Sequence, residues 1–452
     1  MKEEMQIEAK SNLKHLSGFT SYNLPEHQAF HHFYETIRSV YELYGFAAFY
    51  PPPIERLENL LVKGGINNQI YQLATKDHKL TEMGLPFDRT VSLALFVAKE
   101  MNNSISFPFK RYDNSYSFRG ERAAQGRFRG FYQCDVDIID KEVNLDCQAE
   151  CIAAIYDALK ALNVGSFTIH INQISLTKAI LNLFEIVETE HPEYLHVIDK
   201  MPKVTEDVTK KALLDLGLQE EMIESFVQIF NYKGTIEEFL SFIEKLVSVS
   251  KDISEEISKY VDELIQLMQI LETYRIDLHK IQFNPQMARG LNYYTGIVFE
   301  TFLDNLEHVG SIASGGKYAN LVDVFIGREV SIEGMGGSIG LTRLFDICLK
   351  NGIIQPQRQV IADVAILTRE SSLKPLANKL AHALRKKNIK IDVNHTTKKI
   401  SKQLNLSNKK GFRYVAMVMD AESFVVKDLM EQKQQDFSNM EEVVQFLNDF
   451  LC

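Results

Sequence analysis

Tryptophan and paired cysteines are the features that this sequence of 452 residues most clearly lacks. It contains no tryptophan, and its five cysteines include no Cys-x-x-Cys pair. Cys147 and Cys151 are four residues apart, but no second pair of cysteines or histidines follows at the spacing of a zinc finger. We therefore expect free thiols, as in proteins of the reducing cytosol, and we assign no metal-binding side chains.

Long apolar runs and an excess of positive charge are also missing. No run approaches the ~18 apolar residues of a membrane helix. The charged stretch at residues 1–10 lacks the apolar centre of a secretory signal, so we expect a cytoplasmic protein without a membrane anchor. The net charge of −10 argues against a generally basic coat, and any RNA contact would need local basic patches.

The stretch from residue 118 to 139 carries the strongest pattern in the chain. Two β-like runs enclose a loop with three arginines, Arg122, Arg127 and Arg129. In the second run, Phe131, Gln133, Asp135 and Asp137 alternate with Tyr132, Cys134, Val136 and Ile138. Alternation at period two indicates a half-buried strand, and guanidinium groups match phosphate geometry. The stretch therefore predicts a ligand surface beside a phosphate clamp, although a solvated, charged hairpin would have the same composition.

Three stretches resemble, in the same order, the motifs of one enzyme family. Residues 118–137, FRGERAAQGRFRGFYQCDVD, resemble motif 2 of class II aminoacyl-tRNA synthetases, and specifically that of the histidyl-tRNA synthetases. Residues 289–300, RGLNYYTGIVFE, are similar to the histidine signature of that family, and residues 334–345, GMGGSIGLTRLF, to motif 3. The resemblance implies ligation of histidine to its tRNA through a histidyl-adenylate, with ATP and Mg²⁺ as cofactors.

Residues 45–54 resemble motif 1 of the same class. Apolar residues recur every three or four positions before Gly45, which predicts an amphipathic helix that begins near Pro25. Three consecutive prolines, residues 51–53, should end a strand, and a helix should begin near Ile54. The resemblance implies a homodimer interface with Pro52 as the motif's proline. A rigid turn between two elements is the alternative.

The resemblance also assigns ATP-binding residues. Arg119 would contact the α-phosphate and the carboxylate of the amino acid, and Arg289 would do the same during adenylation; these two are the catalytic candidates. Glu121 would accept from the adenine amino group, Phe131 would stack on the adenine ring, Arg127 would reach the outer phosphates, and Arg343 would point at the nucleotide from the first turn of a helix that starts around Leu341.

Histidine-binding residues follow in the same way. Asp88 and Thr90 would bind the α-amino group, because an ammonium group in a cleft needs a carboxylate partner. Either residue could instead cap the helix that follows. Gln133 would face the amino group, Asp137 the imidazole, Arg289 the carboxylate, and Tyr293 and Tyr294 would line the imidazole pocket.

Some positions depart from the family pattern. Ala123 and Ala124 stand where Pro-Gln is common, and that Gln lies near the 5′ end of the histidine tRNA in the family. Asn292 replaces an Asp beside Arg289. In the second histidine signature, residues 311–321, Lys317, Ala319 and Asn320 replace Arg, Asp and Gly, whereas Gly315, Gly316 and Tyr318 match.

The chain beyond the hairpin predicts two further regions. Residues 175–278 show helical spacing almost throughout, and 15 acidic against seven basic residues between Thr205 and Arg275 disfavour RNA contact there. After a linker at residues 355–359, strands alternate with helices, which predicts a small mixed sheet. The expected elements are strands at 360–367, 389–393, 413–419 and 423–429, and helices at 372–387, 398–406 and 440–451.

The resulting fold class is an α+β catalytic domain, an antiparallel sheet flanked by helices, with a helical insertion and a C-terminal α/β anticodon-binding domain. The expected boundaries are 1–174 and 279–354 for the catalytic domain, 175–278 for the insertion and 360–452 for the anticodon-binding domain.

A basic stretch lies in the last of these domains. Between Leu384 and Arg413 there are ten basic residues and one acid, and Lys398, Lys399 and Lys402 are the candidate tRNA contacts. A solvated helix face is the alternative for these three lysines.

A synthetase-like paralogue that binds histidine or tRNA without charging is the rival to a ligase. One type, the regulatory subunit of ATP phosphoribosyltransferase, typically lacks the anticodon-binding domain that this chain is expected to have. Arg119, Arg127, Arg289 and Arg343 are all present, which a purely regulatory protein would not need.

Overall fold

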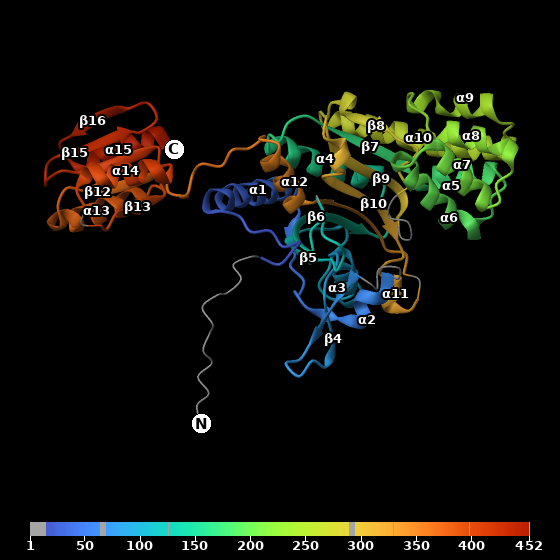
Figure 1. Cartoon of the computed structure of the whole chain (residues 1–452), viewed down its shortest axis with the longest axis horizontal. Coiled ribbons are helices and arrows are strands. Elements are labelled where there is room, and N and C mark those ends of the chain that lie inside the picture. Colours follow the sequence, from blue (N-terminus) through green and yellow to red (C-terminus); the bar gives the residue numbers. More distant parts are fainter. Residues whose placement is uncertain are drawn as a thin grey trace. The chain divides into compact units, whose positions relative to one another are not determined.

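The computed structural model of the protein describes residues 15–63, 69–124, 126–288, 294–328, 330–396 and 398–451. The chain divides into two compact units, one built mainly from residues 33–354 and the other mainly from residues 355–452 (Figure 1). The larger unit contains the hairpin at 118–139, and the smaller unit contains the basic stretch. Each unit is described by itself.

The larger unit is built on an eight-stranded sheet with the order β1-β5-β6-β11-β10-β9-β7-β8. The strands are β1 (Ala47–Ala48), β5 (Phe109–Phe118), β6 (Gly130–Asp140), β7 (Phe167–Gln173), β8 (Ile281–Phe283), β9 (Tyr294–Leu303), β10 (Ala313–Ala319) and β11 (Glu333–Ile339). The six inner strands pair antiparallel, as predicted. The edge strands β1 and β8 are parallel to β5 and β7, which makes the complete sheet mixed.

Helices cover the back of this sheet (Figure 1). They are α1 (Leu24–Leu43), α4 (Leu145–Ala161) and α12 (Leu341–Lys350). The alternation of β6 is the reason: Cys134, Val136 and Ile138 are fully buried on the back, where each aliphatic side chain contributes roughly 1.5–3 kcal/mol by leaving water. The other face of β6 carries the polar residues of the hairpin and faces the candidate site.

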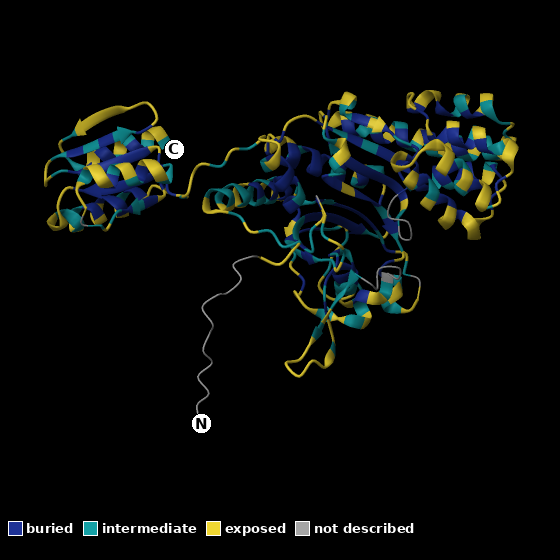
Figure 2. Cartoon of the chain, in the orientation of Figure 1, coloured by how far each residue is buried: buried dark blue, intermediate teal, exposed yellow. Residues whose placement is uncertain are grey.

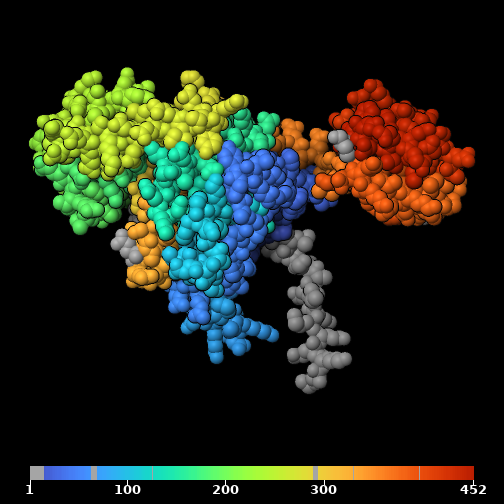
Figure 3. Space-filling model, turned by 180° about the vertical axis from the view of Figure 1, so that it is seen from behind, coloured from blue at the N-terminus to red at the C-terminus, as the bar shows by residue number. Residues whose placement is uncertain are grey.

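A small three-stranded sheet with the order β2-β4-β3 lies beside the main sheet. It comprises β2 (Glu55–Arg56), β3 (Tyr71–Ala74) and β4 (Leu80–Leu85), and is accompanied by α2 (Leu57–Leu60), η1 (Leu61–Lys63) and α3 (Thr90–Glu100). The β3–β4 hairpin projects from the larger unit (Figures 1 and 3). The helix expected from Ile54 begins at Leu57, because Glu55 and Arg56 pair with β4 instead.

The segment between β7 and β8 is helical, as its spacing predicts. It contains α5 (Ile174–Leu183), η3 (Glu188–Glu190), α6 (His191–Lys200), η4 (Met201–Lys203), α7 (Glu206–Asp215), α8 (Glu220–Phe230), α9 (Ile236–Leu246), α10 (Lys251–Thr273) and η5 (Leu278–Lys280). The longest helix, α10, packs against α4 and α5, which joins this segment to the helices behind the sheet. The larger unit is completed by η6 (Glu307–Val309) and α11 (Asp323–Ile326).

The smaller unit has a five-stranded sheet with the order β13-β12-β14-β15-β16. Its elements are β12 (Val364–Thr368), η7 (Ser371–Leu373), α13 (Lys374–Arg385), β13 (Ile391–Val393), α14 (Ile400–Lys410), β14 (Tyr414–Val418), β15 (Phe424–Asp428), β16 (Lys433–Phe437) and α15 (Met440–Leu451). Strands β13, β12 and β14 pair in parallel, whereas β15 pairs antiparallel with both β14 and β16. The mixed sheet is confirmed, with β16 as an additional strand.

Burial follows this layering. In both units the central strands and the inner faces of the helices are buried, and the exposed residues lie on the outer helix faces and loops (Figure 2). Among the helices that the structure describes, none has both the length and the apolar character needed to cross a bilayer.

Candidate active site

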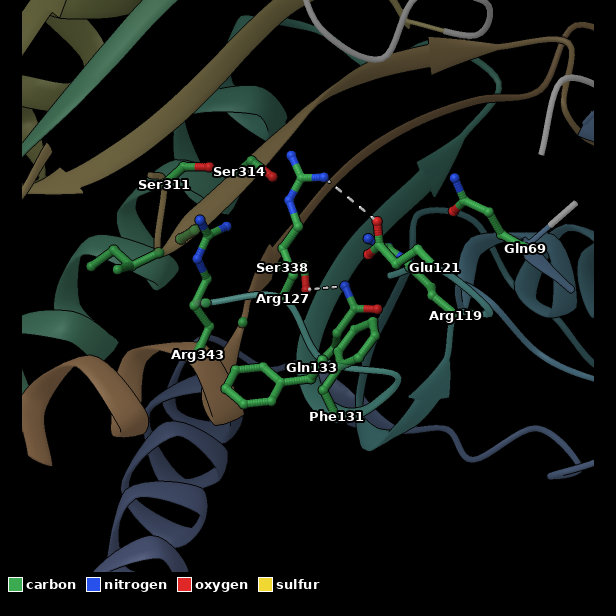
Figure 4. Close-up of a pocket in the computed structure, with 15 residues that line it drawn as sticks. Gln69, Arg119, Glu121, Arg127, Phe131, Gln133, Ser311, Ser314, Ser338 and Arg343 are labelled. Carbon is green, nitrogen blue, oxygen red and sulfur yellow. Dashed lines mark hydrogen bonds and ion pairs between the residues drawn. The ribbon is translucent and has the colours of Figure 1, made fainter. Parts of the chain in front are cut away.

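Two adjoining cavities open on the front face of the large sheet. The larger has a volume of about 410 Å³ and the smaller about 140 Å³. Both are lined by Arg119, Gln133, Ser314 and Ser338, so these residues mark the place where the cavities meet. Figure 4 shows the larger cavity, with side chains from β6, the loop before it, β10, β11 and α12 turned toward a common space.

All five residues predicted to bind ATP line the larger cavity. They are Arg119, Glu121, Arg127, Phe131 and Arg343. Arg127 is 66% exposed, and its Nη1 lies 3.8 Å from Oε2 of Glu121 across the loop (Figure 4). This ion pair is long and solvated, so little energy opposes a movement of Arg127 toward an incoming phosphate.

Arg119 is held in place from two sides. Its Nε donates to the carbonyl of Phe87 at 3.2 Å, and its guanidinium lies over the ring of Phe131, 5.1 Å from the centroid. A guanidinium over an aromatic face is stabilised by roughly 0.5–2 kcal/mol. The cation that both cavities share is therefore oriented before any substrate arrives.

Arg343 enters the larger cavity from the first turn of α12, as predicted. It donates to the carbonyl of Val309 and packs against Gly126 and Gly310. Both glycines have positive φ, +69° and +88°, and a Cβ on Gly310 would overlap the guanidinium. Glycine at these positions is thus required by the backbone and by the approach of Arg343.

The smaller cavity collects the described residues that were predicted to bind histidine. Asp88, Thr90, Gln133, Asp137 and Tyr294 all line it. Asp88 also accepts from the backbone N–H of Val91 at 3.1 Å, in the first turn of α3. The position of Asp88 therefore agrees with both interpretations, because its carboxylate accepts from the start of the helix and also lines the cavity.

Asp137 lies at the base of the smaller cavity with both carboxylate oxygens engaged. Its Oδ2 is 2.6 Å from Nη2 of Arg111, and its Oδ1 accepts from the hydroxyl of Tyr318 at 2.8 Å. Gly336 lies opposite on β11, where a Cβ would overlap Oδ1. The carboxylate is thus fixed in one orientation by the guanidinium of Arg111, the hydroxyl of Tyr318 and the close backbone of Gly336.

A buried chain of charges continues from Asp137 beneath the cavity. Arg111 also lies 3.9 Å from Asp113, and Asp113 accepts from Nε of Arg89 at 2.8 Å. Arg89 in turn donates to the carbonyl of Pro51 at 3.2 Å. Side chains this deeply buried require paired charges, and Arg111 and Asp113 are fully buried.

Sequence reasoning missed several of these residues as parts of the site. Arg89, Arg111, Asp113, Tyr318 and Ser338 received no role. The alternation of charged Arg111 and Asp113 within an otherwise β-like stretch is a signal that could have found two of them, because charges inside a central strand need partners.

Asp135 is also part of the smaller cavity. It is 6% exposed, and burial raises the pKa of its carboxyl to about 7, while Arg111 and a hydrogen bond from Ser338 oppose the rise. The neighbouring carboxylates of Asp137 and Asp113 raise the pKa further. Asp135 therefore gives up its proton less readily than an exposed aspartate does.

Part of the predicted site falls outside the described residues. Arg289, Asn292 and Tyr293 are in the interval 289–293, which the structure does not describe. The second catalytic candidate, Arg289, is therefore known here from its sequence alone. The neighbouring Tyr294 begins β9 and reaches the smaller cavity.

Two of the departures from the family pattern have local explanations. Asn320, in place of Gly, has φ of +63°, a left-handed conformation that asparagine adopts more readily than other non-glycine residues. Lys317, in place of Arg, forms an ion pair of 2.9 Å with Glu333. We find no structural account of Ala319 in place of Asp.

The three candidate tRNA-binding lysines belong to the smaller unit and line neither cavity. All three are exposed. Lys399 is the N-cap of α14, which begins at Ile400, so the helix predicted from Lys398 starts two residues later. The exposed lysines fit either a contact surface or a solvated helix end.

Comparison with known proteins extends these observations. The family model "Histidyl-tRNA synthetase" matches residues 18–344, and the model "Anticodon binding domain" matches residues 363–449. The histidine–tRNA ligase of Nostoc sp. (strain PCC 7120) is 33% identical over 441 residues, covering 94% of each chain. That of Wolinella succinogenes is 35% identical over 427 residues, covering 93% of each chain.

Solved structures agree with the sequence relatives. The crystal structure of histidyl-tRNA synthetase from Nostoc sp. PCC 7120 has a TM-score of 0.87 and 32% identity, covering 98% of this chain and 100% of that one. Both the catalytic-family region at residues 18–344 and the C-terminal region at residues 363–449 therefore have counterparts in known proteins. The chain belongs to the histidyl-tRNA synthetase family.

Proposed function

We propose that the protein is a histidine–tRNA ligase, which uses ATP to activate histidine and then transfers it to the histidine tRNA. The observation that carries this proposal is the meeting of two cavities at Arg119. One is lined by arginines that suit a triphosphate, and the other is lined by carboxylates that suit an amino acid with two cationic groups. The family and its curated relatives support the same reaction.

Histidine would lie in the smaller cavity. Its α-ammonium would be bound by Asp88, Thr90 and the side-chain oxygen of Gln133, and its imidazole by Asp137, with Tyr294 alongside. A carboxylate held against a ring N–H fixes the tautomer of an imidazole. Because Asp137 is itself held by Arg111 and Tyr318, we expect it to select the imidazole by geometry as well as by charge.

ATP would lie in the larger cavity. Phe131 would stack on adenine, Glu121 would accept from its amino group, and Arg127 and Arg343 would hold the phosphates. Mg²⁺ would accompany the phosphates. Magnesium ions keep most of their ligands as water and substrate phosphate, which fits a chain whose described residues include no cluster of three or more His, Cys, Asp or Glu side chains that could hold a metal.

The chemical step would be a displacement at the α-phosphorus of ATP. The carboxylate of histidine attacks this atom, its oxygen forms the new bond, and pyrophosphate leaves with the electrons of the broken bond. Arg119, and Arg289 by its place in the histidine signature, would stabilise the negative charge that develops on the α-phosphate. A hydroxyl group at the 3′ end of the tRNA then attacks the carbonyl carbon of the histidyl-adenylate. The new ester bond forms, and AMP leaves.

Domain roles follow from this proposal. Residues 1–174 and 279–354 would form the catalytic domain, residues 175–278 an insertion, and residues 360–452 the anticodon-binding domain. Lys398, Lys399 and Lys402 would contact phosphates of the tRNA, because they are exposed and stand in the most basic stretch of the chain. We place the ligase in the cytoplasm, where translation takes place.

The active form would be a homodimer that pairs through the motif 1 region. Large apolar side chains are exposed around the prolines and on the adjoining small sheet: Tyr50, Ile54, Leu61, Leu80 and Met83. A group of this kind is typical of a protein–protein interface. Light scattering should give about twice the chain mass of 51.8 kDa, and a monomer mass would refute the dimer.

The decisive experiment is histidine-dependent exchange between ATP and pyrophosphate, measured beside tRNA charging. Exchange together with charging is the expected result. Exchange without charging would keep the active site and overturn the assigned tRNA contacts. Histidine binding without exchange would instead identify a sensor or regulatory paralogue built on the same fold.

A further inference from the structure

A short segment before α1, residues 16–19, is attached to the base of the hairpin that joins β5 to β6. The carbonyl of Gly18 accepts from the backbone N–H groups of Arg129 at 2.8 Å and of Gly130 at 3.3 Å. Phe19 also forms an isolated parallel bridge with Gly130. The backbone at the end of the hairpin loop is therefore held by a part of the chain that is distant in sequence.

Side chains close the same contact. The rings of Phe19 and Tyr116 fill the space that a Cβ of Gly130 would need, with ring atoms 2.6 and 2.7 Å from its position. The aliphatic part of Arg129 lies against Gly18, where a Cβ would be 2.8 Å from Cγ of the arginine. A glycine without a side chain at position 18 thus permits the course of the Arg129 side chain.

Arg129 contacts the loop and not the cavities. Its Nε donates to the backbone carbonyl of Glu121 at 3.0 Å, and its own carbonyl accepts from the N–H of Arg119 at 2.9 Å. Glu121 and Arg119 line the larger cavity, whereas Arg129 lines neither cavity. Of the three loop arginines that the sequence suggested as a phosphate clamp, Arg127 reaches the larger cavity and Arg129 instead holds the loop behind it.

The carboxylate of Glu121 has little else to fix it from the loop side. Its ion pair with Arg127 is 3.8 Å long, and the arginine is 66% exposed. A pair of this kind constrains a side chain weakly. The hydrogen bond from Arg129 to the Glu121 carbonyl is shorter and comes from a side chain that is half-buried, so it sets the place from which the carboxylate reaches into the cavity.

We propose that Arg129, held by residues 16–19, is a positioning residue that sets Glu121 for recognition of the adenine amino group. The inference rests on the proposed function, which assigns that amino group to Glu121. A site built to accept from an N–H group discriminates against an analogue that lacks the group, provided that the acceptor is held in place. Loss of the Arg129 donor lets the loop shift, and Glu121 then loses the amino group while Arg127 and Arg343 still face the phosphates.

The test compares ATP with purine riboside 5′-triphosphate, which lacks the amino group of adenine. Calorimetry in the presence of Mg²⁺ gives both dissociation constants, and the unaltered protein should prefer ATP. Arg129→Met should reduce this preference about tenfold, the scale of one hydrogen bond, and leave the affinities for the analogue and for histidine unchanged. Arg38→Met is the matched control, because Arg38 is also half-buried, pairs with carboxylates of its own helix and lines neither cavity.

A glycine variant tests the part played by residues 16–19. In Gly18→Ala the added methyl group would displace the Arg129 side chain, so the preference for ATP should fall as it does in Arg129→Met. Gly165→Ala is the matched control, because its φ of +97° is close to the +86° of Gly18, yet a Cβ there would meet no described atom within 4 Å. In an Arg129→Ala background, Gly18→Ala should have no further effect on the preference.

Three results would overturn the proposal. An unchanged preference in Arg129→Met would mean that Glu121 is positioned without this arginine. An equal loss of affinity for both triphosphates would mean that Arg129 contacts phosphate. A Gly18→Ala variant that behaves like Gly165→Ala would separate residues 16–19 from the recognition of adenine. Unchanged histidine binding shows in each case that the variant is folded.

The outcome is also separate from that of the proposed function, because calorimetry does not require catalysis. A protein that prefers ATP through Arg129 but shows no pyrophosphate exchange would support this inference and fail as a ligase. Exchange by a protein that binds ATP and the analogue equally would support the ligase and overturn this inference.

Discussion

Nη2 of Arg111 and Oδ2 of Asp137 lie 2.6 Å apart, and their side chains are 0% and 4% exposed. Asp113 is also within ion-pair distance of Arg111, so one buried cation serves two buried carboxylates. Removing one partner of such a group leaves an uncompensated charge away from water. The pair therefore links the stability of the fold to the shape of the smaller cavity.

Replacing Arg111 with methionine should destabilise the protein by about 3–5 kcal/mol, because the buried Asp137 would lose its paired cation, whereas Asp113 would keep Arg89. Urea unfolding measures this loss. The matched control is Lys110→Met, since the adjacent Lys110 pairs with Glu150 at 2.6 Å in a partly exposed position and should cost about 0–1 kcal/mol. Equal effects of the two variants would contradict the role given to Arg111.

Replacing Arg127 with alanine should raise the Michaelis constant for ATP about tenfold in the exchange assay, which corresponds to ~1.4 kcal/mol. The constant for histidine should stay the same, because Arg127 lines only the larger of the two cavities. The midpoint of thermal unfolding should also stay the same, as the side chain is 66% exposed. A variant that lost affinity for histidine as well would show that the two cavities do not divide the substrates as proposed.

Replacing Gly336 with alanine should weaken histidine binding at least tenfold, because the added methyl group would overlap Oδ1 of Asp137. Binding of ATP provides the internal comparison and should change little. The two dissociation constants can be measured on the same preparation. Unchanged histidine affinity would mean that Asp137 does not contact the imidazole.

Charge reversal at Lys398 and Lys399 should weaken tRNA binding and leave pyrophosphate exchange intact. If each lysine contacts one phosphate, the salt dependence of binding should fall by about one unit of slope per lysine. Lys433→Glu is the control, as Lys433 is an exposed lysine of β16 in the same unit. An equal loss of affinity in that variant would indicate a general charge effect rather than a specific contact.

Variants of Asn320 test whether the left-handed backbone conformation at this position limits which residues it accepts. Because its φ is +63°, Asn320→Gly should be neutral or slightly stabilising, whereas Asn320→Val should cost about 1–2 kcal/mol. Chemical unfolding distinguishes the two variants. If valine were tolerated as well as glycine, the left-handed conformation could not explain why asparagine replaces the family's glycine.

Much of the fold could be predicted because its signals are local. The alternation from Phe131 to Ile138 defined both the strand β6 and its buried face, and the resemblance of residues 334–345 to motif 3 placed the start of α12 near Leu341. Strand β16 was missed because its five residues are exposed or half-exposed, which leaves no apolar alternation to detect. A strand at a sheet edge can be specified mainly by the strand beside it.

The candidate site also contains some residues that the sequence could identify and others that it could not. Residues within quoted motifs, such as Phe131 and Arg343, were assigned to one ligand by resemblance, and both line the larger cavity. Arg111 lies outside the quoted motifs, and although its charge within a strand signals a need for a partner, the identity of that partner depends on which residue lies opposite it on the neighbouring strand. Register of this kind depends on how two strands and the turn between them fit together, which neither strand shows alone.

Arg89 has a consequence that reaches beyond the pocket. Its guanidinium joins the carbonyl of Pro51 to Asp113, and Arg111 joins Asp113 to the carboxylate of Asp137. A continuous row of hydrogen bonds and ion pairs thus connects the proline segment with the smaller cavity, where histidine is proposed to bind. Binding free energies are reciprocal, so if pairing of two chains at the prolines favours histidine binding, histidine must favour that pairing by the same factor. The concentration of histidine would then influence the fraction of paired chains, and pairing would influence the affinity for histidine, through a single coupled equilibrium.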